Sequence, residues 1–70
     1  MKPNTDYKYI AHQLRLAKNA LNEPDRTDVL KRTYTSMVYG IILGVYRSRR
    51  ITSNQMQLAT KYIELLQDAI

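Results

Sequence analysis

The stretch Ile51-Thr52-Ser53-Asn54-Gln55-Met56 decides how the chain divides into helices. Thr52 followed three residues later by Gln55 fits a capping box, in which the Thr side chain caps the Gln amide and the Gln side chain reaches back. Ile51 and Met56 are placed for the hydrophobic staple that accompanies such a box. The motif predicts a helix over about residues 53–69. Its apolar stripe consists of Met56, Ala59, Ile63, Leu66 and Ile70, widened by Tyr62 and Leu58.

The segment before this motif predicts a longer helix, over about residues 26–49, with Asp25 or Thr27 as its N-cap. Its main stripe is expected to be Leu30, Tyr34, Met37, Val38, Ile41 and Val45, while Tyr39, Ile42, Leu43 and Tyr46 extend apolar character around the cylinder. A helix that is apolar nearly all round is covered nearly all round. We therefore expect this helix to be the central element, with partners on two sides.

The N-terminal part predicts a further helix over about residues 5–22, capped by Thr5 or Asp6 and ended before Pro24. Its stripe is expected to be Tyr7, Ile10, Ala11, Leu14, Ala17 and Leu21. The connections are short, so the helices should be neighbours in sequence order. The sequence predicts an all-α fold, a three-helix bundle in a single domain over residues 1–70.

A chain of 70 residues has a thin core. Burying its apolar surface supplies about 110 kcal/mol, and ordering the chain costs about 105 kcal/mol. Small chains in this position often gain stability from a disulfide, a metal or a partner subunit. There is no Cys and one His, so no disulfide, metal site or cofactor is expected. Self-association as a homodimer, or a bound partner, remains as the means of gaining stability.

The chain is basic, with 11 Lys and Arg residues against 6 Asp and Glu residues and a net charge of +5. Such a charge favours an anionic partner, either nucleic acid or an acidic protein surface. Three Arg residues gather in Arg47-Ser48-Arg49-Arg50, and Arg presents a planar fork that suits phosphate. The expected nucleic-acid-binding residues are Arg47, Arg49, Arg50, Lys61, Ser53 and Asn54, with Arg26, Lys31 and Arg32 as a second patch.

These features favour a small regulatory or accessory protein that binds nucleic acid around the turn between the second and third helices. A helix-turn-helix reader of DNA fits less well, because the second helix is long and the turn lacks Gly. The same Arg cluster also fits a charge cap at the end of an apolar helix.

The alternative is a protein-interaction module or inhibitor that docks a helical face on a larger protein. The expected interface residues are Tyr39, Gly40, Ile42, Leu43, Gly44 and Tyr46. Gly40 and Gly44 share one side of the helix, and glycine there costs about 1 kcal/mol relative to Ala. We expect the close approach of another helix of the same chain, or of a second chain, to offset that cost.

No catalytic constellation is visible, and neither an enzyme nor a small-molecule substrate is expected. The N-terminal residues lack the apolar core of a signal peptide. The longest apolar run, Met37 to Tyr46, falls far short of the roughly 20 residues that span a bilayer. The sequence predicts a cytoplasmic protein without a membrane span. The sequence gives less support to a third hypothesis, binding to an anionic lipid surface, because the cations do not lie opposite one continuous apolar face.

Overall fold

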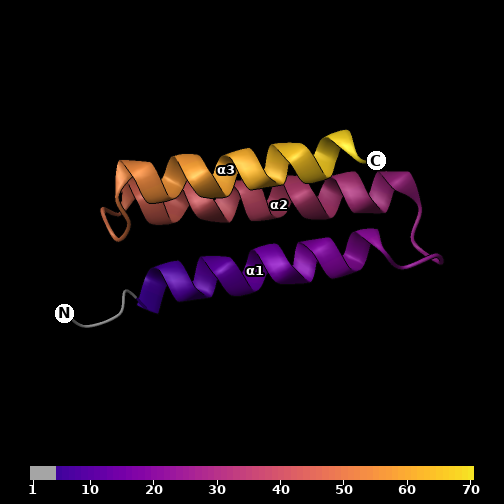
Figure 1. Ribbon diagram of the computed structural model, residues 1–70, viewed down its shortest axis with the longest axis horizontal. Coiled ribbons are helices and arrows are strands. Elements are labelled where there is room, and N and C mark those ends of the chain that lie inside the picture. The colour runs from indigo at the N-terminus through magenta and orange to yellow at the C-terminus, as the bar shows by residue number, and fades with distance from the viewer. Residues whose placement is uncertain (1–4) are drawn as a thin grey trace.

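The computed structural model describes residues 5–70, which form three helices joined by short turns. The helices are α1 (Thr5–Leu21), α2 (Asp28–Arg47) and α3 (Ser53–Asp68). They run up, down and up, so that α1 begins at the same end of the bundle as the α2–α3 turn (Figure 1). This architecture confirms the predicted all-α three-helix bundle. None of the helices in the described part of the chain has the length and apolarity needed to cross a membrane.

The capping box at the start of α3 is confirmed. The Thr52 hydroxyl accepts a hydrogen bond from the Gln55 amide at 3.1 Å, and the Gln55 side-chain oxygen accepts one from the Thr52 amide at 2.9 Å. At α2, the Thr27 hydroxyl accepts from the Leu30 amide at 3.2 Å, so that helix begins at Asp28 rather than residue 26. Thr5 and Asp6, the expected caps of the first helix, lie inside α1.

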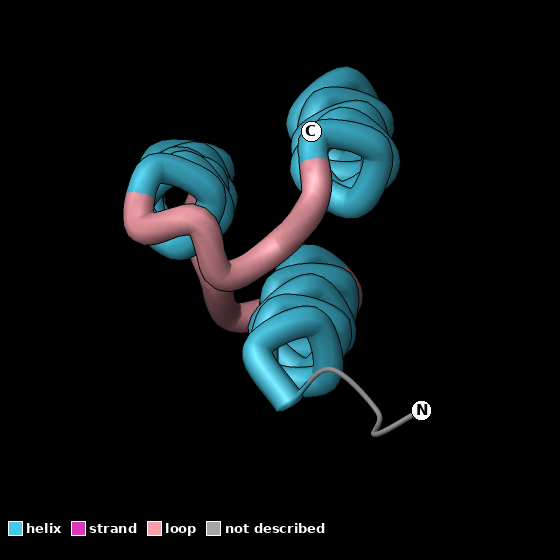
Figure 2. The backbone as a smooth tube through the Cα atoms, turned by 90° about the vertical axis from the view of Figure 1, so that its left-hand side faces the viewer, coloured by secondary structure: helices cyan, strands magenta, loops and turns pink. Residues whose placement is uncertain are grey.

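The three helices form a triangle in cross-section, and each contacts the other two (Figure 2). As predicted, the second helix is the longest of the three and packs against a partner on two sides, but it is not covered nearly all round. In a triangle each helix buries one stripe against its neighbours and leaves the opposite side open. That geometry leaves a long face of α2 uncovered.

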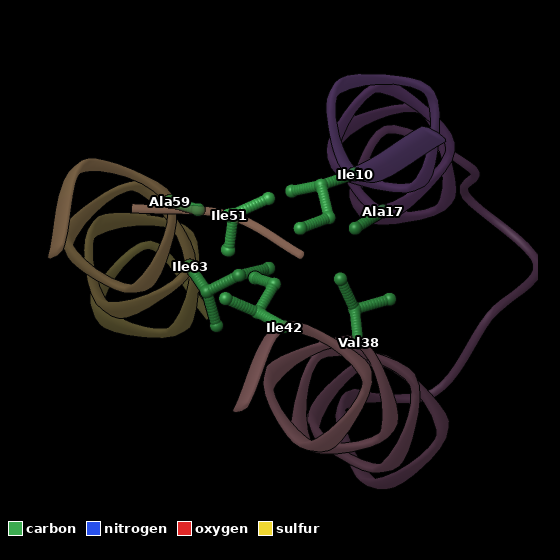
Figure 3. Packing of buried hydrophobic residues seen from close by; sticks show 7 residues of the cluster. All are labelled: Ile10, Ala17, Val38, Ile42, Ile51, Ala59 and Ile63. Carbon is green, nitrogen blue, oxygen red and sulfur yellow. The ribbon is translucent and has the colours of Figure 1, made fainter. Parts of the chain in front are cut away.

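The core is a single cluster that all three helices share. Figure 3 shows the side chains of its seven buried residues, which point toward one another between the helices. They are Ile10 and Ala17 from α1, Val38 and Ile42 from α2, Ile51 from the turn, and Ala59 and Ile63 from α3. The expected stripes of the first and third helices supply most of their share, and Tyr7, Leu14, Met56 and Leu66 pack against the cluster. Ala11, Leu58 and Tyr62 are exposed instead.

The expected stripe of the second helix is partly wrong. Leu30 and Met37 are 54% and 55% exposed, whereas Ile42 is fully buried. The buried side of α2 also includes Thr35, whose hydroxyl donates to the Arg32 carbonyl oxygen at 3.0 Å and accepts from the Gln67 amide at 3.2 Å. These bonds satisfy the hydroxyl, so a polar residue occupies a core position at little cost.

Candidate nucleic-acid interface

The three Arg residues predicted to bind nucleic acid all lie at the α2–α3 turn and are exposed. Arg47 is the last residue of α2, and Arg49 and Arg50 follow after the C-cap residue Ser48. We call these three residues the basic turn. In the described part of the chain neither Arg47 nor Arg49 has an ion-pair partner. Both side chains are exposed, so an anion in solution can reach them.

Arg49 adopts a left-handed backbone conformation, with φ of 60°. The amide of Arg50 donates to the Val45 carbonyl at 3.2 Å, and the amide of Arg49 donates to the Tyr46 carbonyl at 2.9 Å. These two bonds make a Schellman motif, whose left-handed position is usually Gly. A residue with a Cβ atom there costs about 1–2 kcal/mol. The chain thus holds a cation where the backbone favours glycine.

The basic turn is tied to the beginning of α1. The Arg50 guanidinium lies 3.8 Å from the Asp6 carboxylate, and the two side chains are 63% and 37% exposed. Lys8 is exposed two residues further along α1, so it adds a cation at this end of the bundle. We call Lys8, Arg47, Arg49 and Arg50 the basic end. Sequence analysis missed Lys8, although short connections predict that the first helix begins beside this turn.

The predicted residues of α3 continue from the turn along that helix. Ser53, Asn54 and Lys61 are all exposed, and the Ser53 hydroxyl accepts from the Gln57 side chain at 3.4 Å. Asn54 and Lys61 lie seven residues apart on one side of α3, where they line a hollow of about 390 Å³ with Gln57 and Leu58. Lys61 is thus about 12 Å from the start of the helix.

The second predicted patch is less available to an anion. Arg26 donates to the Glu23 carboxylate at 2.6 Å, and its guanidinium lies 5.9 Å from the centre of the Tyr34 ring. The hydrogen bond to Glu23 raises the pKa of Arg26 above its ordinary value. Arg32 is exposed and Lys31 is half-buried. With Asp25 and Asp28 nearby in the sequence, this end of the bundle is close to neutral.

The residues predicted as a protein interface do not lie on one surface. Ile42 is fully buried in the core of the chain, and Tyr39, Leu43 and Tyr46 are half-buried. Gly40 and Gly44 are exposed on the opposite side of α2. A Cβ atom added at either would meet nothing within 4 Å, so the expected approach of another helix of the same chain is wrong. The apolar face expected to dock on a partner is therefore largely occupied by the chain's own helices.

The arrangement of α2 and α3 does not suit a helix-turn-helix. That motif joins its helices at about 90–120°, whereas α2 and α3 lie antiparallel along their length (Figure 1). The hydrogen bond between Gln67 and Thr35, far from the turn, shows that the two helices remain adjacent. A surface built on the turn therefore presents cations rather than a projecting recognition helix.

No known protein family matches the chain, and no characterised protein or solved structure is detectably similar to it. Across residues 5–70 no group of three or more His, Asp and Glu side chains could hold a metal ion.

Proposed function

We propose that this chain is a small non-enzymatic regulatory or accessory protein that binds nucleic acid through its basic end. The observation that carries the proposal is the conformation of Arg49. Strained backbone conformations persist where the surrounding structure enforces them, and they cluster at functional sites. An exposed Arg in a left-handed position that favours Gly is accounted for by a need for its charge.

The chemistry of the basic end suits a phosphate backbone. Each Arg can donate two parallel hydrogen bonds to phosphate oxygens, and Lys8 adds a compact point charge. Ser53 and Asn54 offer neutral donors just beyond the turn. Phosphate contacts position a protein without reading bases, so the basic end supplies affinity and orientation rather than sequence preference.

The distribution of charge favours the basic end of the bundle, over the opposite end, as the place where a polyanion binds. Asp6 is the carboxylate that lies beside the basic turn. At the opposite end, Glu23 pairs with Arg26, and Asp28 begins α2. An asymmetric charge distribution steers the approach of a charged partner. A polyanion is expected to meet the basic end first.

An acidic protein surface is the alternative partner for the same cations, as part of an interaction module or inhibitor. Binding of the basic end to an acidic protein through solvated ion pairs would also weaken with salt, but the chain would then show no binding preference for nucleic acid. The absence of Cys fits a reducing, cytoplasmic setting for either partner. A homodimer, also part of this proposal, would supply the partner subunit from which so small a chain gains stability.

Fluorescence anisotropy with labelled duplex and single-stranded DNA, at about 50 and 200 mM salt, tests the proposal. The test variant replaces Arg47, Arg49 and Arg50 by Ala. The matched control replaces Arg15, Lys18 and Arg32 by Ala, because these exposed cations lie away from the basic end. Both variants lose three positive charges, so a difference between them reports position and not net charge.

Four phosphate contacts at the basic end give a slope of log affinity against log salt of about −3.6, and the wild type should weaken about 150-fold between those salt concentrations. The test variant should weaken about 3.5-fold, because one contact remains. The control variant should behave like the wild type. Equal behaviour of the two variants, or no binding by the wild type at low salt, would refute the proposal.

A further inference from the structure

A groove of about 290 Å³ lies between α2 and α3, which run side by side (Figure 1). Ser36 and Tyr39 of α2 line one side of it, and Glu64 and Gln67 of α3 line the other. Its volume is close to the lower limit for sites that hold small ligands, and in helical bundles such sites form between helices. The groove therefore has room for one compact group, whose chemistry must suit four polar side chains.

The core of the bundle fixes the orientation of the Gln67 side chain. The buried Thr35 hydroxyl has one proton, which it donates to the Arg32 carbonyl oxygen at 3.0 Å. The hydroxyl therefore accepts from Gln67, whose amide nitrogen faces it at 3.2 Å. The carbonyl oxygen of the same Gln67 amide is left to accept a hydrogen bond from a ligand.

The other polar groups of the groove have no partner in the part of the chain that the structure describes. The side chains of Ser36, Tyr39 and Glu64 make neither a hydrogen bond nor an ion pair there. A carboxylate accepts hydrogen bonds only, and the two hydroxyls accept as well as donate. The groove thus offers several acceptors and one negative charge, and no cation lines it among residues 5–70.

We propose that this groove binds a guanidinium group, of the kind that arginine carries. Guanidinium has five N–H donors and no acceptor, which suits a groove rich in acceptors. Its planar fork can donate two parallel hydrogen bonds to the Glu64 carboxylate. Its flat face stacks on aromatic rings, and the half-buried ring of Tyr39 lines the groove.

The net charge of +5 does not prevent a cation from binding here. Exposed charges separated by more than about 8 Å are largely screened at physiological ionic strength. Glu64 lies eleven residues beyond Ser53, so it is about 16 Å along α3 from the basic turn. Lys61 is one turn from Glu64, but it lines a different hollow and makes no ion pair with the carboxylate.

The same geometry discriminates between organic cations. An alkylammonium group carries the same charge as guanidinium, but it is a compact and strongly hydrated point charge with three donors. It has no flat face to stack on the Tyr39 ring and cannot form the paired hydrogen bonds to Glu64. We therefore expect the groove to bind a guanidinium group more tightly than an ammonium group.

An NMR titration of the full chain with acetyl-arginine amide, without nucleic acid, tests the site. Small ligands bind weakly to open grooves, so we expect a dissociation constant of about 1 mM. The amide signals of Ser36, Tyr39, Glu64 and Gln67 should shift most. The corresponding lysine derivative should bind more weakly. Free arginine distinguishes the source of the group, since tighter binding of the capped form indicates a side chain of a partner protein and tighter binding of the free form indicates a small molecule.

The test variant is Glu64→Gln, which keeps the size of the side chain and its preference for a helix. It should bind acetyl-arginine amide about tenfold more weakly, because it loses the hydrogen bonds to a charged group. Its melting temperature should match the wild type, since Glu64 is exposed. The matched control is Asp25→Asn, which removes one negative charge at an exposed position in the α1–α2 turn, and it should bind like the wild type.

The absence of shifts at the groove with about 20 mM acetyl-arginine amide would overturn the proposal. So would equal binding by the wild type and Glu64→Gln, or binding of the lysine derivative as tightly as the arginine derivative. Equal weakening by Asp25→Asn would mean that net charge attracts the probe, and would overturn it as well. Because no nucleic acid is present, each of these results leaves the proposed binding at the basic end intact.

Discussion

Replacing Arg49 by Gly should make the protein more stable and weaken its binding to nucleic acid. Arg49 holds a φ of 60°, which costs about 1–2 kcal/mol for a residue with a Cβ atom. Gly removes that strain. Its greater conformational freedom in the unfolded chain, however, lowers the free energy of unfolding by about 0.4–1 kcal/mol. The net gain is about 0.5–1 kcal/mol, or about 2–8 °C in melting temperature for a domain of this size.

The loss of binding follows from one missing phosphate contact. The association constant varies with salt concentration to a power of about −0.9 for each phosphate contact. One contact therefore raises the association constant about eightfold at 0.1 M salt relative to its value at 1 M salt. Arg49→Gly should therefore bind DNA about eightfold more weakly at 0.1 M salt, with a salt slope reduced by about 0.9.

Thermal unfolding by circular dichroism and anisotropy with labelled DNA measure the two effects on the same samples. Arg49→Ala keeps the left-handed strain and removes the charge, so it should bind like the Gly variant and melt like the wild type. Arg49→Lys keeps the strain and the charge, so it should match the wild type in melting temperature and in salt slope. A Gly variant that melts lower, or that binds as tightly as the wild type, would refute the reasoning about this turn.

The packing of the bundle supports three further expectations. Thr52→Ala removes the capping box of α3 and should lower the free energy of unfolding by about 1 kcal/mol, measured by thermal melting. Ile42→Ala leaves a cavity among the fully buried side chains and should cost about 2–5 kcal/mol in urea unfolding; a smaller loss would contradict the placement of Ile42 in the core. Gln67→Leu deletes a donor to the buried Thr35 hydroxyl, which keeps its bond to the Arg32 carbonyl; a loss of about 1 kcal/mol is expected, and none would mean that the α2–α3 hydrogen bond is not formed in solution.

The helix boundaries were predictable where a side chain bonds to its own backbone. The Thr52 and Gln55 pair is local, so four residues of sequence specify the start of α3. Thr27 was one of two candidate caps for α2, and the hydrogen bond from the Leu30 amide selects it. Local bonds of this kind do not depend on how the helices pack.

The buried side of α2 was not predictable by counting apolar residues. Apolar side chains surround most of this helix, so periodicity alone favoured a stripe through Leu30 and Met37. The true stripe runs through Thr35, whose hydroxyl donates to the Arg32 carbonyl and accepts from Gln67 of α3. That contact spans 32 residues of sequence and has no local signal. The glycines were a usable signal, since Gly40 and Gly44 lie opposite the buried side.

In the candidate site, too, the local features were predictable from the sequence and the long-range contacts were not. The Arg cluster is visible in the sequence, and all three members lie in one exposed turn. Its ion pair with Asp6 joins residues far apart in the chain and depends on the packing of α1. The left-handed conformation of Arg49 was hidden as well, because Arg is an unusual choice for that position.

The most direct test of the basic end is an NMR titration of the labelled protein with a short DNA duplex at low salt. We expect the first and largest amide shifts at Arg47–Asn54 and at Lys8, with little change at Glu23–Arg32. Shifts concentrated at the opposite end of the bundle, or the absence of any shift at saturating DNA, would contradict binding through the basic end.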